Sequence, residues 1–238
     1  MHEARRGRHR AVVQTTAASA LGRMIVKLGK RLSLPVINVV RAEQVGLLRG
    51  LGAEYVVNSS EPEFDTRLRE LCHRLAATIG FDAVAGEMFP LLLGAQPRGS
   101  RLLVYGALSL QASHADSASL IFEGKRLEEF SLDAWLRSRT LLGRLRLARQ
   151  IQELLRSDLK THFQAKVPLQ EANRALRQHA VNMTTGKVLL RDERAARELI
   201  RVQFKDRRGN DDSDHLAEYA FHFIQRERSQ GSGPDVAA

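Results

Sequence analysis

Short apolar runs alternate with amphipathic stretches along most of this chain. Runs of about four to eight residues rich in Val, Ile and Ala predict strands of a sheet that is buried on both faces. Apolar residues at spacings of three and four, followed by glycine, predict helices. The expected strands are residues 11–16, 35–40, 54–58, 81–85, 101–105 and 126–132, and the expected helices between them are residues 20–31, 43–51, 65–78 and 88–93.

Regular alternation of strand and helix is typical of right-handed parallel βαβ units. The sequence therefore predicts an α/β fold, a Rossmann-type doubly wound parallel sheet of six strands. A further helix, strand, helix and strand are expected at residues 141–156, 162–167, 169–179 and 187–190. Residues 192–238 mix charges of both signs and contain two short helical stretches, 193–204 and 215–226, so we expect a polar tail, partly helical or disordered.

The composition excludes several classes of protein. No apolar run approaches the roughly 18 residues of a membrane span. The basic residues 1–10 are not followed by the apolar stretch of a secretory signal. Cys72 is the only cysteine, which excludes an internal disulfide and indicates a reducing, cytoplasmic setting.

The net charge of +10 raises the question of a nucleic-acid partner. The basic residues are spread through helical stretches among Glu and Asp, and only 5% of the residues are aromatic. No zinc-finger, helix-turn-helix or base-stacking pattern is present. The sequence therefore favours a phosphorylated small molecule over nucleic acid as the anionic ligand.

The turn between the first strand and the first helix, residues 17–22, reads AASALG. A pyrophosphate must come within hydrogen-bonding distance of main-chain N–H groups at a helix N-terminus, and small side chains allow that approach. Ser19 can cap the helix or donate its hydroxyl, and Gly22 lets the helix pack closely on the strand. Many helices begin with such turns, so the indication comes from its place in the first βα unit.

Arg41 directly follows the second strand, where an NAD-specific domain presents Asp or Glu to the ribose hydroxyls. An arginine there would pair with the 2′-phosphate of NADPH. A charge-assisted hydrogen bond of about 1.5–3 kcal/mol gives a roughly ten- to hundredfold preference. A solvated loop arginine is the alternative. Glu43 could still serve a ribose, so the sequence favours NADPH and leaves NADH open.

Several segments together carry a family resemblance: VQTTAASALGRM (13–24), VINVVR (36–41), LGAEYVVNSS (51–60), FDAVAG (81–86) and TGKVLL (185–190). In order and spacing they resemble the medium-chain dehydrogenase/reductase superfamily, in particular its zinc-independent quinone oxidoreductases and enoyl-thioester reductases. The resemblance covers about residues 11–191. It implies NADP(H)-dependent hydride transfer to a small-molecule substrate, of quinone, enone or enoyl type, in a homodimer whose cofactor sheets join edge to edge.

The resemblance also assigns roles to individual residues. It would place Ser19, Ala20 and Gly22 at the pyrophosphate and Arg41 at the 2′-phosphate. The residues that it would place near the nicotinamide, or approaching the cofactor from the last strand, are Tyr105, Gly106, Leu108, Phe130 and Lys187. Tyr105 and Phe130 are more often core aromatics, and Lys187 also fits a solvated strand end. No catalytic residue can be named.

The departures from the family concern its catalytic domain, which precedes the Rossmann domain in its members. Catalytic zinc in that domain is bound by Cys and His, and structural zinc by a four-cysteine lobe, and this sequence contains neither. We therefore expect a basic extension (1–10), the cofactor domain (11–158), the return segment of an incomplete catalytic domain (159–191) and the tail (192–238). Because the substrate pocket lacks one wall, the alternative is a catalytically inactive nucleotide-binding module or a truncated gene product.

Two other groupings were weaker candidates for chemistry. His215 and His222 lie seven residues apart without acidic or cysteine partners, so no metal site is expected. Ser109, His114 and Asp116 fall in one loop without a nucleophile elbow, and a polar loop is the simpler interpretation.

Overall fold

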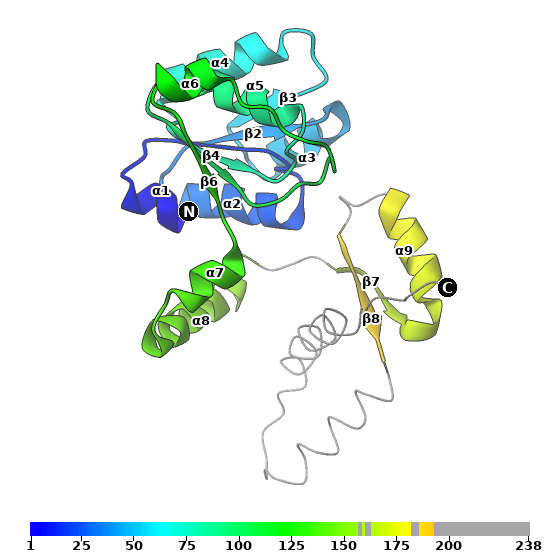
Figure 1. Ribbon diagram of the computed structural model, residues 1–238. Coiled ribbons are helices and arrows are strands. Elements are labelled where there is room, and N and C mark those ends of the chain that lie inside the picture. Colours follow the sequence, from blue (N-terminus) through cyan, green and yellow to red (C-terminus); the bar gives the residue numbers. More distant parts are fainter. Residues whose placement is uncertain (157–158, 160–162, 182–185, 193–238) are drawn as a thin grey trace, which may run out of the picture. The chain divides into compact units, whose positions relative to one another are not determined.

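The computed structural model describes residues 1–156, 159, 163–181 and 186–192. These residues form two compact units (Figure 1). The first contains the described residues up to 159 together with Gly186, and the second contains residues 163–181 and 187–192. The expected tail helices, 193–204 and 215–226, lie outside the described residues.

The first unit is built on a six-stranded sheet in the order β3-β2-β1-β4-β5-β6. Neighbouring strands are parallel, with Val13 opposite both Ile37 and Gly80. This strand order is that of a Rossmann sheet, so the predicted fold class is confirmed. The strands are β1 (Val12–Gln14), β2 (Val36–Val40), β3 (Tyr55–Asn58), β4 (Ile79–Asp82), β5 (Arg101–Val104) and β6 (Arg126–Glu129).

Helices join these strands and cover both faces of the sheet (Figure 1). They include three that the sequence pattern did not predict, α1, α6 and α7, each of only five or six residues. The full set in this unit is α1 (His2–Arg6), α2 (Ala20–Arg31), the 3₁₀ turn η1 (Ala42–Gln44), α3 (Val45–Gly50), α4 (Phe64–Leu75), α5 (Met88–Ala95), α6 (Ser117–Ile121), α7 (Leu132–Arg137) and α8 (Leu141–Arg156).

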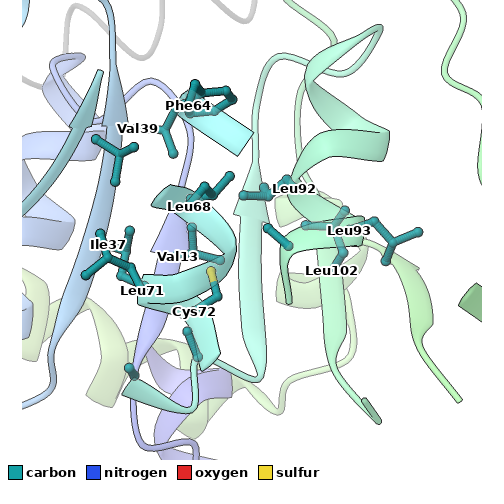
Figure 2. Packing of buried hydrophobic residues seen from close by; sticks show 14 of the residues in the cluster. Val13, Ile37, Val39, Phe64, Leu68, Leu71, Cys72, Leu92, Leu93 and Leu102 are labelled. Carbon is teal, nitrogen blue, oxygen red and sulfur yellow. The ribbon is translucent and has the colours of Figure 1, made fainter. Parts of the chain in front are cut away.

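The main core lies between the sheet and helices α4 and α5 (Figure 2). Strand residues such as Val13 and Ile37 pack there against Leu68 of α4 and Leu92 of α5. Fully burying one such leucine stabilises the fold by about 1.5–3 kcal/mol. On the opposite face, Ala4 of α1 joins a second buried cluster, so the residues 1–10 that we expected to be an extension contribute to the core.

A chain of buried amide groups links the first three strands. Gln14 Nε2 donates to Gly22 O at 3.1 Å and to Asn38 Oδ1 at 2.8 Å. Asn38 Nδ2 in turn donates to Tyr55 O at 3.0 Å. Because Gln14 and Asn38 are 0% and 1% exposed, these bonds replace water that the two side chains have lost.

Several element boundaries differ from the sequence-based expectation, and two of these differences have a clear local cause. Helix α4 ends at Leu75 and not at the expected residue 78, because Ala76 adopts the left-handed conformation (φ 51°, ψ 52°). Gly80 lies within β4, where a Cβ atom would be 2.7 Å from Leu102 Cδ1. Strand β6 ends at Glu129, three residues early, because Ser131 caps α7 by accepting from the Ala134 N–H at 3.4 Å.

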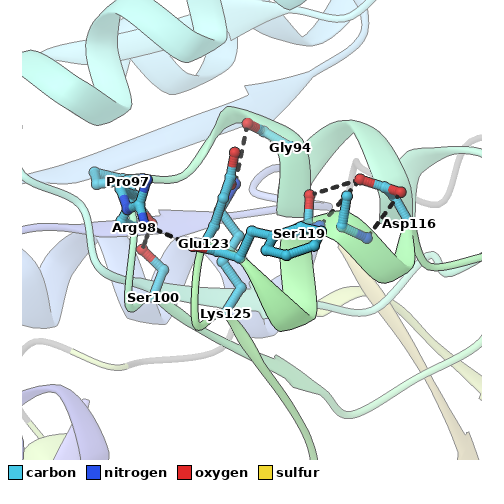
Figure 3. Close-up of polar contacts among 10 residues, drawn as sticks. Gly94, Pro97, Arg98, Ser100, Asp116, Ser119, Glu123 and Lys125 are labelled. Atoms are coloured by element: carbon cyan, nitrogen blue, oxygen red, sulfur yellow. Dashed lines mark hydrogen bonds and ion pairs between the residues drawn. The ribbon is translucent and has the colours of Figure 1, made fainter.

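Polar side chains fix the segment that leads into β6 (Figure 3). The buried Lys125 Nζ lies 2.6 Å from Glu123 Oε2 and donates to Gly94 O, near the end of α5, at 3.4 Å. Arg98 Nη2 donates to Phe122 O at 2.6 Å. A cation beside the last carbonyls of a helix is stabilising, so these contacts tie the segment to α5 before the edge strand begins.

The second unit is a small strand-helix-strand arrangement, close to the one expected for residues 162–190. Strand β7 (Phe163–Pro168) is followed by η2 (Leu169–Glu171), α9 (Ala172–Val181) and β8 (Lys187–Arg191). The two strands are parallel, and Ala175 and Leu189 are buried.

Candidate functional site

The candidate site lies at the carboxyl edge of the six-stranded sheet. From β1 the chain passes to β2 on one side, whereas β4 lies on the other side of β1. The strand order therefore reverses between β1 and β4. Ligands of open α/β sheets bind outside the carboxyl ends of the strands at such a reversal.

The turn after β1 brings the start of α2 directly to this edge. A Cβ atom at Gly22 would lie 2.5 Å from Thr16 O and 2.6 Å from Ala17 Cα, so a larger residue would push the helix away from the turn. Ser19 is the N-cap residue, and its Oγ accepts from the Gly22 N–H at 3.0 Å. The first N–H groups of a helix have no acceptor within it. The start of α2, at Ala20, thus offers donors and the positive end of the helix dipole.

Thr15 and Asp82 join the two strands that flank the reversal. Thr15 Oγ1 donates to Asp82 Oδ1 at 2.8 Å and accepts from the Ala83 N–H at 2.9 Å. The Asp82 carboxylate also accepts from the N–H groups of Val84 at 2.9 Å and Ala85 at 3.2 Å. This carboxylate bends the chain after Asp82, which is why the strand expected over residues 81–85 ends there.

The chain after β5 passes close to the end of β4. The Leu108 N–H donates to Ala83 O at 3.0 Å. A Cβ atom at Gly106 would lie 2.9 Å from the same oxygen, so Gly106 permits the close approach. The Leu108 side chain is 70% exposed, which leaves an apolar group open to solvent at the edge.

Tyr105 and Phe130 lie at the ends of β5 and β6 and pack against the second core cluster. Burial raises the pKa of Tyr105, and the neighbouring Thr16 side chain offsets part of that rise. The Tyr105 Oη is buried and makes no hydrogen bond of acceptable geometry within the described residues. Phe130 donates its N–H to Val104 O at 2.9 Å, and its ring centroid lies 6.2 Å from that of Trp135.

Arg41 stands at the end of β2 with its side chain in solvent. Its Nε lies 3.0 Å from Glu43 Oε1, and the two side chains are 68% and 61% exposed. The Arg41 N–H donates to Gln44 Oε1 at 3.3 Å, which holds the main chain at the start of η1. The main chain of Arg41 is thus held in place, whereas its guanidinium group is accessible to solvent.

Eight of the nine expected cofactor residues follow strands of one sheet at its carboxyl edge: Ser19, Ala20, Gly22, Arg41, Tyr105, Gly106, Leu108 and Phe130. Lys187 opens β8 in the second unit, so its approach to the cofactor remains a prediction. Sequence reasoning missed the pair Thr15 and Asp82. An aspartate inside the otherwise apolar run FDAVAG was the available signal.

Other candidate groups have structural roles. Asp116 caps α6 by accepting from the N–H groups of Ala118 and Ser119, both at 3.1 Å, and these bonds lower the pKa of its carboxyl. Cys72 is buried in the main core, and burial raises its pKa to about 12. Within the described residues, no group of three or more His, Cys, Asp or Glu could hold a metal ion. No helix in that part of the chain is long and apolar enough to span a bilayer.

The fold and the turn at the carboxyl edge of the six-stranded sheet place this chain in the class of doubly wound α/β proteins with a dinucleotide-type turn after the first strand. The model of the zinc-binding dehydrogenase family matches residues 20–153. The chain belongs to this family, and with it to the medium-chain dehydrogenase/reductase superfamily that the sequence resembled.

Several similar proteins and structures are named as reductases. Mitochondrial enoyl-[acyl-carrier-protein] reductases of Arabidopsis thaliana and Caenorhabditis elegans are each 26% identical, over 61% and 52% of this chain. The chain spans 39% and 36% of their lengths. A putative NADPH:quinone reductase from Mesorhizobium loti is 29% identical with a TM-score of 0.72, covering 80% of this chain and 55% of that one. An enoyl thioester reductase from Candida tropicalis, 21% identical with a TM-score of 0.61, covers 75% and 53% and shares the fold.

Proposed function

We propose that this chain is the cofactor-binding part of an NADPH-dependent oxidoreductase that transfers hydride to a quinone, enone or enoyl-type substrate. The observation that carries the proposal is the contact between Gly22 and the turn after β1, where an added Cβ would lie 2.5 Å from Thr16 O. That contact holds a helix N-terminus at the reversal of strand order, where a pyrophosphate can reach main-chain donors. The names of the quinone and enoyl reductases similar to this chain support the reaction class.

The buried side chains at the edge fit a bound dinucleotide. Burial removes water from the Tyr105 hydroxyl and the Thr16 side chain compensates only part of that loss, so a ligand that accepts a hydrogen bond from Tyr105 Oη would be favoured there. Gly106 keeps the chain after β5 close to the end of β4, because a Cβ atom there would lie 2.9 Å from Ala83 O.

In the proposed complex each end of the cofactor is held by a different part of the edge. Ser19, Ala20 and Gly22 would hold the pyrophosphate, and Arg41 would hold the 2′-phosphate. The nicotinamide end would lie near Tyr105, Gly106, Leu108 and Phe130, with Lys187 approaching from the second unit. The bound nicotinamide would supply the hydride, and the residues of this chain would orient it and exclude water from one side.

The substrate side of the site belongs to the family's catalytic domain. We assign residues 11–158 to the cofactor domain, extended by α1 from residues 1–10, residues 159–191 to the return segment of the catalytic domain, and residues 192–238 to the tail. The chain spans 39% and 36% of the lengths of the two enoyl reductases. The identity of the substrate and the direction of hydride transfer are therefore proposed from the names of these relatives.

We further propose a homodimer formed through β6, the edge strand of the sheet, in a cytoplasmic protein. The outer edge of β6 leaves main-chain groups available for pairing with a second copy. The buried, protonated Cys72 suits a reducing compartment, since it is the only cysteine and has no partner for a disulfide.

Fluorescence titration with NADPH tests the binding half of the proposal. We expect saturable binding below millimolar concentration, with Arg41→Ala lowering the affinity for NADPH while leaving that for NADH unchanged. Absence of saturable binding would overturn the proposal. Steady-state oxidation of NADPH with quinones and enones tests the catalytic half, and turnover well above the rate without protein is the expected result.

A second candidate is a nucleotide-binding module without catalysis. It is favoured by Leu108 and Leu110, whose apolar side chains are 70% and 92% exposed beside the proposed nicotinamide end, where a substrate wall would cover them. This candidate predicts the same saturable NADPH binding but no turnover with any acceptor.

A further inference from the structure

The main chain that carries Arg41 is fixed, whereas its side chain is free to exchange partners. The Ser59 N–H donates to Val40 O at 2.8 Å, and the Arg41 N–H donates to Gln44 Oε1 at 3.3 Å. By contrast, the ion pair between Arg41 Nε and Glu43 Oε1, 3.0 Å apart, is 68% and 61% exposed. Exposed pairs are weak, so a ligand can displace Glu43 from the guanidinium.

A second acidic group near this end of the sheet, Glu61, has partners of its own. Glu61 follows β3, and its Oε2 lies 3.3 Å from Arg67 Nη1. Its Oε1 accepts from Asn58 Nδ2 at 3.3 Å. Glu43 is therefore the carboxylate that acts on Arg41, while Glu61 provides an acidic neighbour of similar exposure with a different partner.

We propose that Glu43 is a specificity-determining residue of this site, a role that rests on the proposed binding of a nicotinamide dinucleotide. In the free protein Glu43 occupies Arg41 and competes with the 2′-phosphate of NADPH. When the ligand carries a free 2′-hydroxyl, Glu43 accepts its hydrogen bond, as acidic residues do near the second strand of NAD-specific domains. The Arg41–Glu43 pair thus allows both forms of the cofactor and sets the ratio between them.

Removal of the Glu43 charge has opposite expected effects on the two ligand types. A phosphorylated ribose no longer has to displace Glu43, so its affinity should rise by about 1.5- to fivefold, the range for an exposed ion pair. A ribose with a free 2′-hydroxyl loses a charged acceptor, so its affinity should fall about fivefold. The ratio of the two affinities should move about tenfold.

Calorimetric titration of the full chain with adenosine 2′,5′-bisphosphate and with ADP tests the role of Glu43 without any enzymatic turnover. The variants are Glu43→Gln, Arg41→Ala, the double variant, and Glu61→Gln as the matched control. Both probes are anions, so a general gain from the loss of one negative charge would be the same in Glu43→Gln and Glu61→Gln. We expect the opposite shifts in Glu43→Gln alone, and we expect the gain for the bisphosphate to vanish when Arg41 is absent.

The results separate this inference from the function on which it rests. If the wild-type chain binds both probes and Glu43→Gln shifts them in the same direction, or no more than Glu61→Gln does, the role of Glu43 is wrong and the cofactor site stands. If the wild-type chain binds neither the probes nor NADPH, the proposed function fails, and the role of Glu43 fails with it.

Discussion

The Thr15 hydroxyl and the Asp82 carboxylate meet at 2.8 Å between the ends of β1 and β4, and neither residue is more than 1% exposed. Because Thr15 also accepts from the Ala83 N–H at 2.9 Å, it bonds to both the side chain of β4 and the turn that follows. The two strand ends that flank the proposed pyrophosphate position are held together by side chains, in addition to the ladder of the sheet.

Replacing Asp82 by alanine is expected to destabilise the fold strongly. The change leaves three donors, on Thr15, Val84 and Ala85, without their acceptor. With about 1–3 kcal/mol for each buried donor left unsatisfied, and some relaxation, we expect a loss of about 2–4 kcal/mol in the free energy of unfolding, measured with urea. Asp116→Ala removes an exposed helix cap and should cost about 1 kcal/mol. Equal losses in the two variants would contradict the role of Asp82.

Adding a methyl group to Gly22 should separate the helix from the turn. The new Cβ would meet main-chain atoms at 2.5–2.6 Å, which no side-chain movement can relieve. We expect Gly22→Ala to lower both the stability and the affinity for NADPH. The control is Gly46→Ala in α3, where no atom beyond the adjacent residues and the helix's own backbone lies within 4 Å of the new methyl group. That control should gain about 0.5–1 kcal/mol from its better helix propensity. A Gly22→Ala protein that binds NADPH normally would refute the close approach.

The buried thiol of Cys72 is expected to make the fold sensitive to alkaline pH. Burial raises its pKa from 9.0 to about 12, so the folded protein keeps the proton where the unfolded chain releases it. The retained proton stabilises the folded state. This contribution to the free energy of unfolding is fully present below pH 9 and decreases between pH 9 and about 12. Urea unfolding over this range should show a smaller decline for Cys72→Ala than for wild type. Identical declines would show that the thiol is not protected.

Alkylation offers an independent measurement on the same residue. Since Cys72 is the only cysteine, uptake of iodoacetamide reports this thiol alone. The native protein should react far more slowly at pH 8 than the urea-unfolded chain, because the thiolate is the reactive form.

The ion pair between β5 and β6 should stabilise the edge strand above acidic pH. Arg101 bonds to both Glu128 oxygens, at 2.7 and 2.5 Å, and these bonds lower the pKa of Glu128. A lowered carboxyl pKa contributes stability above its ordinary value of 4.5, and that contribution disappears as the pH falls through the folded-state pKa. Since the pair is 24% and 34% exposed, Glu128→Gln should cost only about 0.5–1 kcal/mol at neutral pH.

The matched control for the edge strand is Glu129→Gln, the exposed next residue of β6. Its unfolding free energy should stay within about 0.5 kcal/mol of wild type. If Glu128→Gln loses as much stability at pH 3 as at pH 7, the ion pair is not the source of the effect.

The order of elements could be predicted from the sequence because each strand is a distinct apolar run. The β-branched run at residues 36–40 predicts the strand, and the glycine after the following helix predicts the end of that helix. Boundaries were harder to predict, since they depend on single residues in unusual conformations. Ala76 takes a left-handed conformation with φ 51°, which is unfavourable for a residue with a side chain. No sequence pattern near it predicts this conformation.

The same distinction applies to the candidate site: the position of a residue after a strand could be predicted from the sequence, whereas contacts between distant side chains could not. The positions of Ser19, Gly22 and Arg41 at the carboxyl edge could be predicted because each follows directly from the strand before it, and their contacts with a cofactor stay a prediction. The link between Thr15 and Asp82 could not, since it joins residues 67 positions apart through side-chain geometry. The assignment of Lys187 depends on how the second unit approaches the cofactor, and it stays a prediction.

The buried amides of Gln14 and Asn38 have a consequence for how the sheet assembles. Apolar strands such as VINVV would pack almost as well after sliding by two residues, because each face would again present aliphatic side chains. Sliding β1 against β2 would break the 2.8 Å bond from Gln14 Nε2 to Asn38 Oδ1 and leave this buried oxygen without that donor. The bond between these two side chains therefore favours the native alignment of the first two strands, in which Gln14 and Asn38 lie opposite each other.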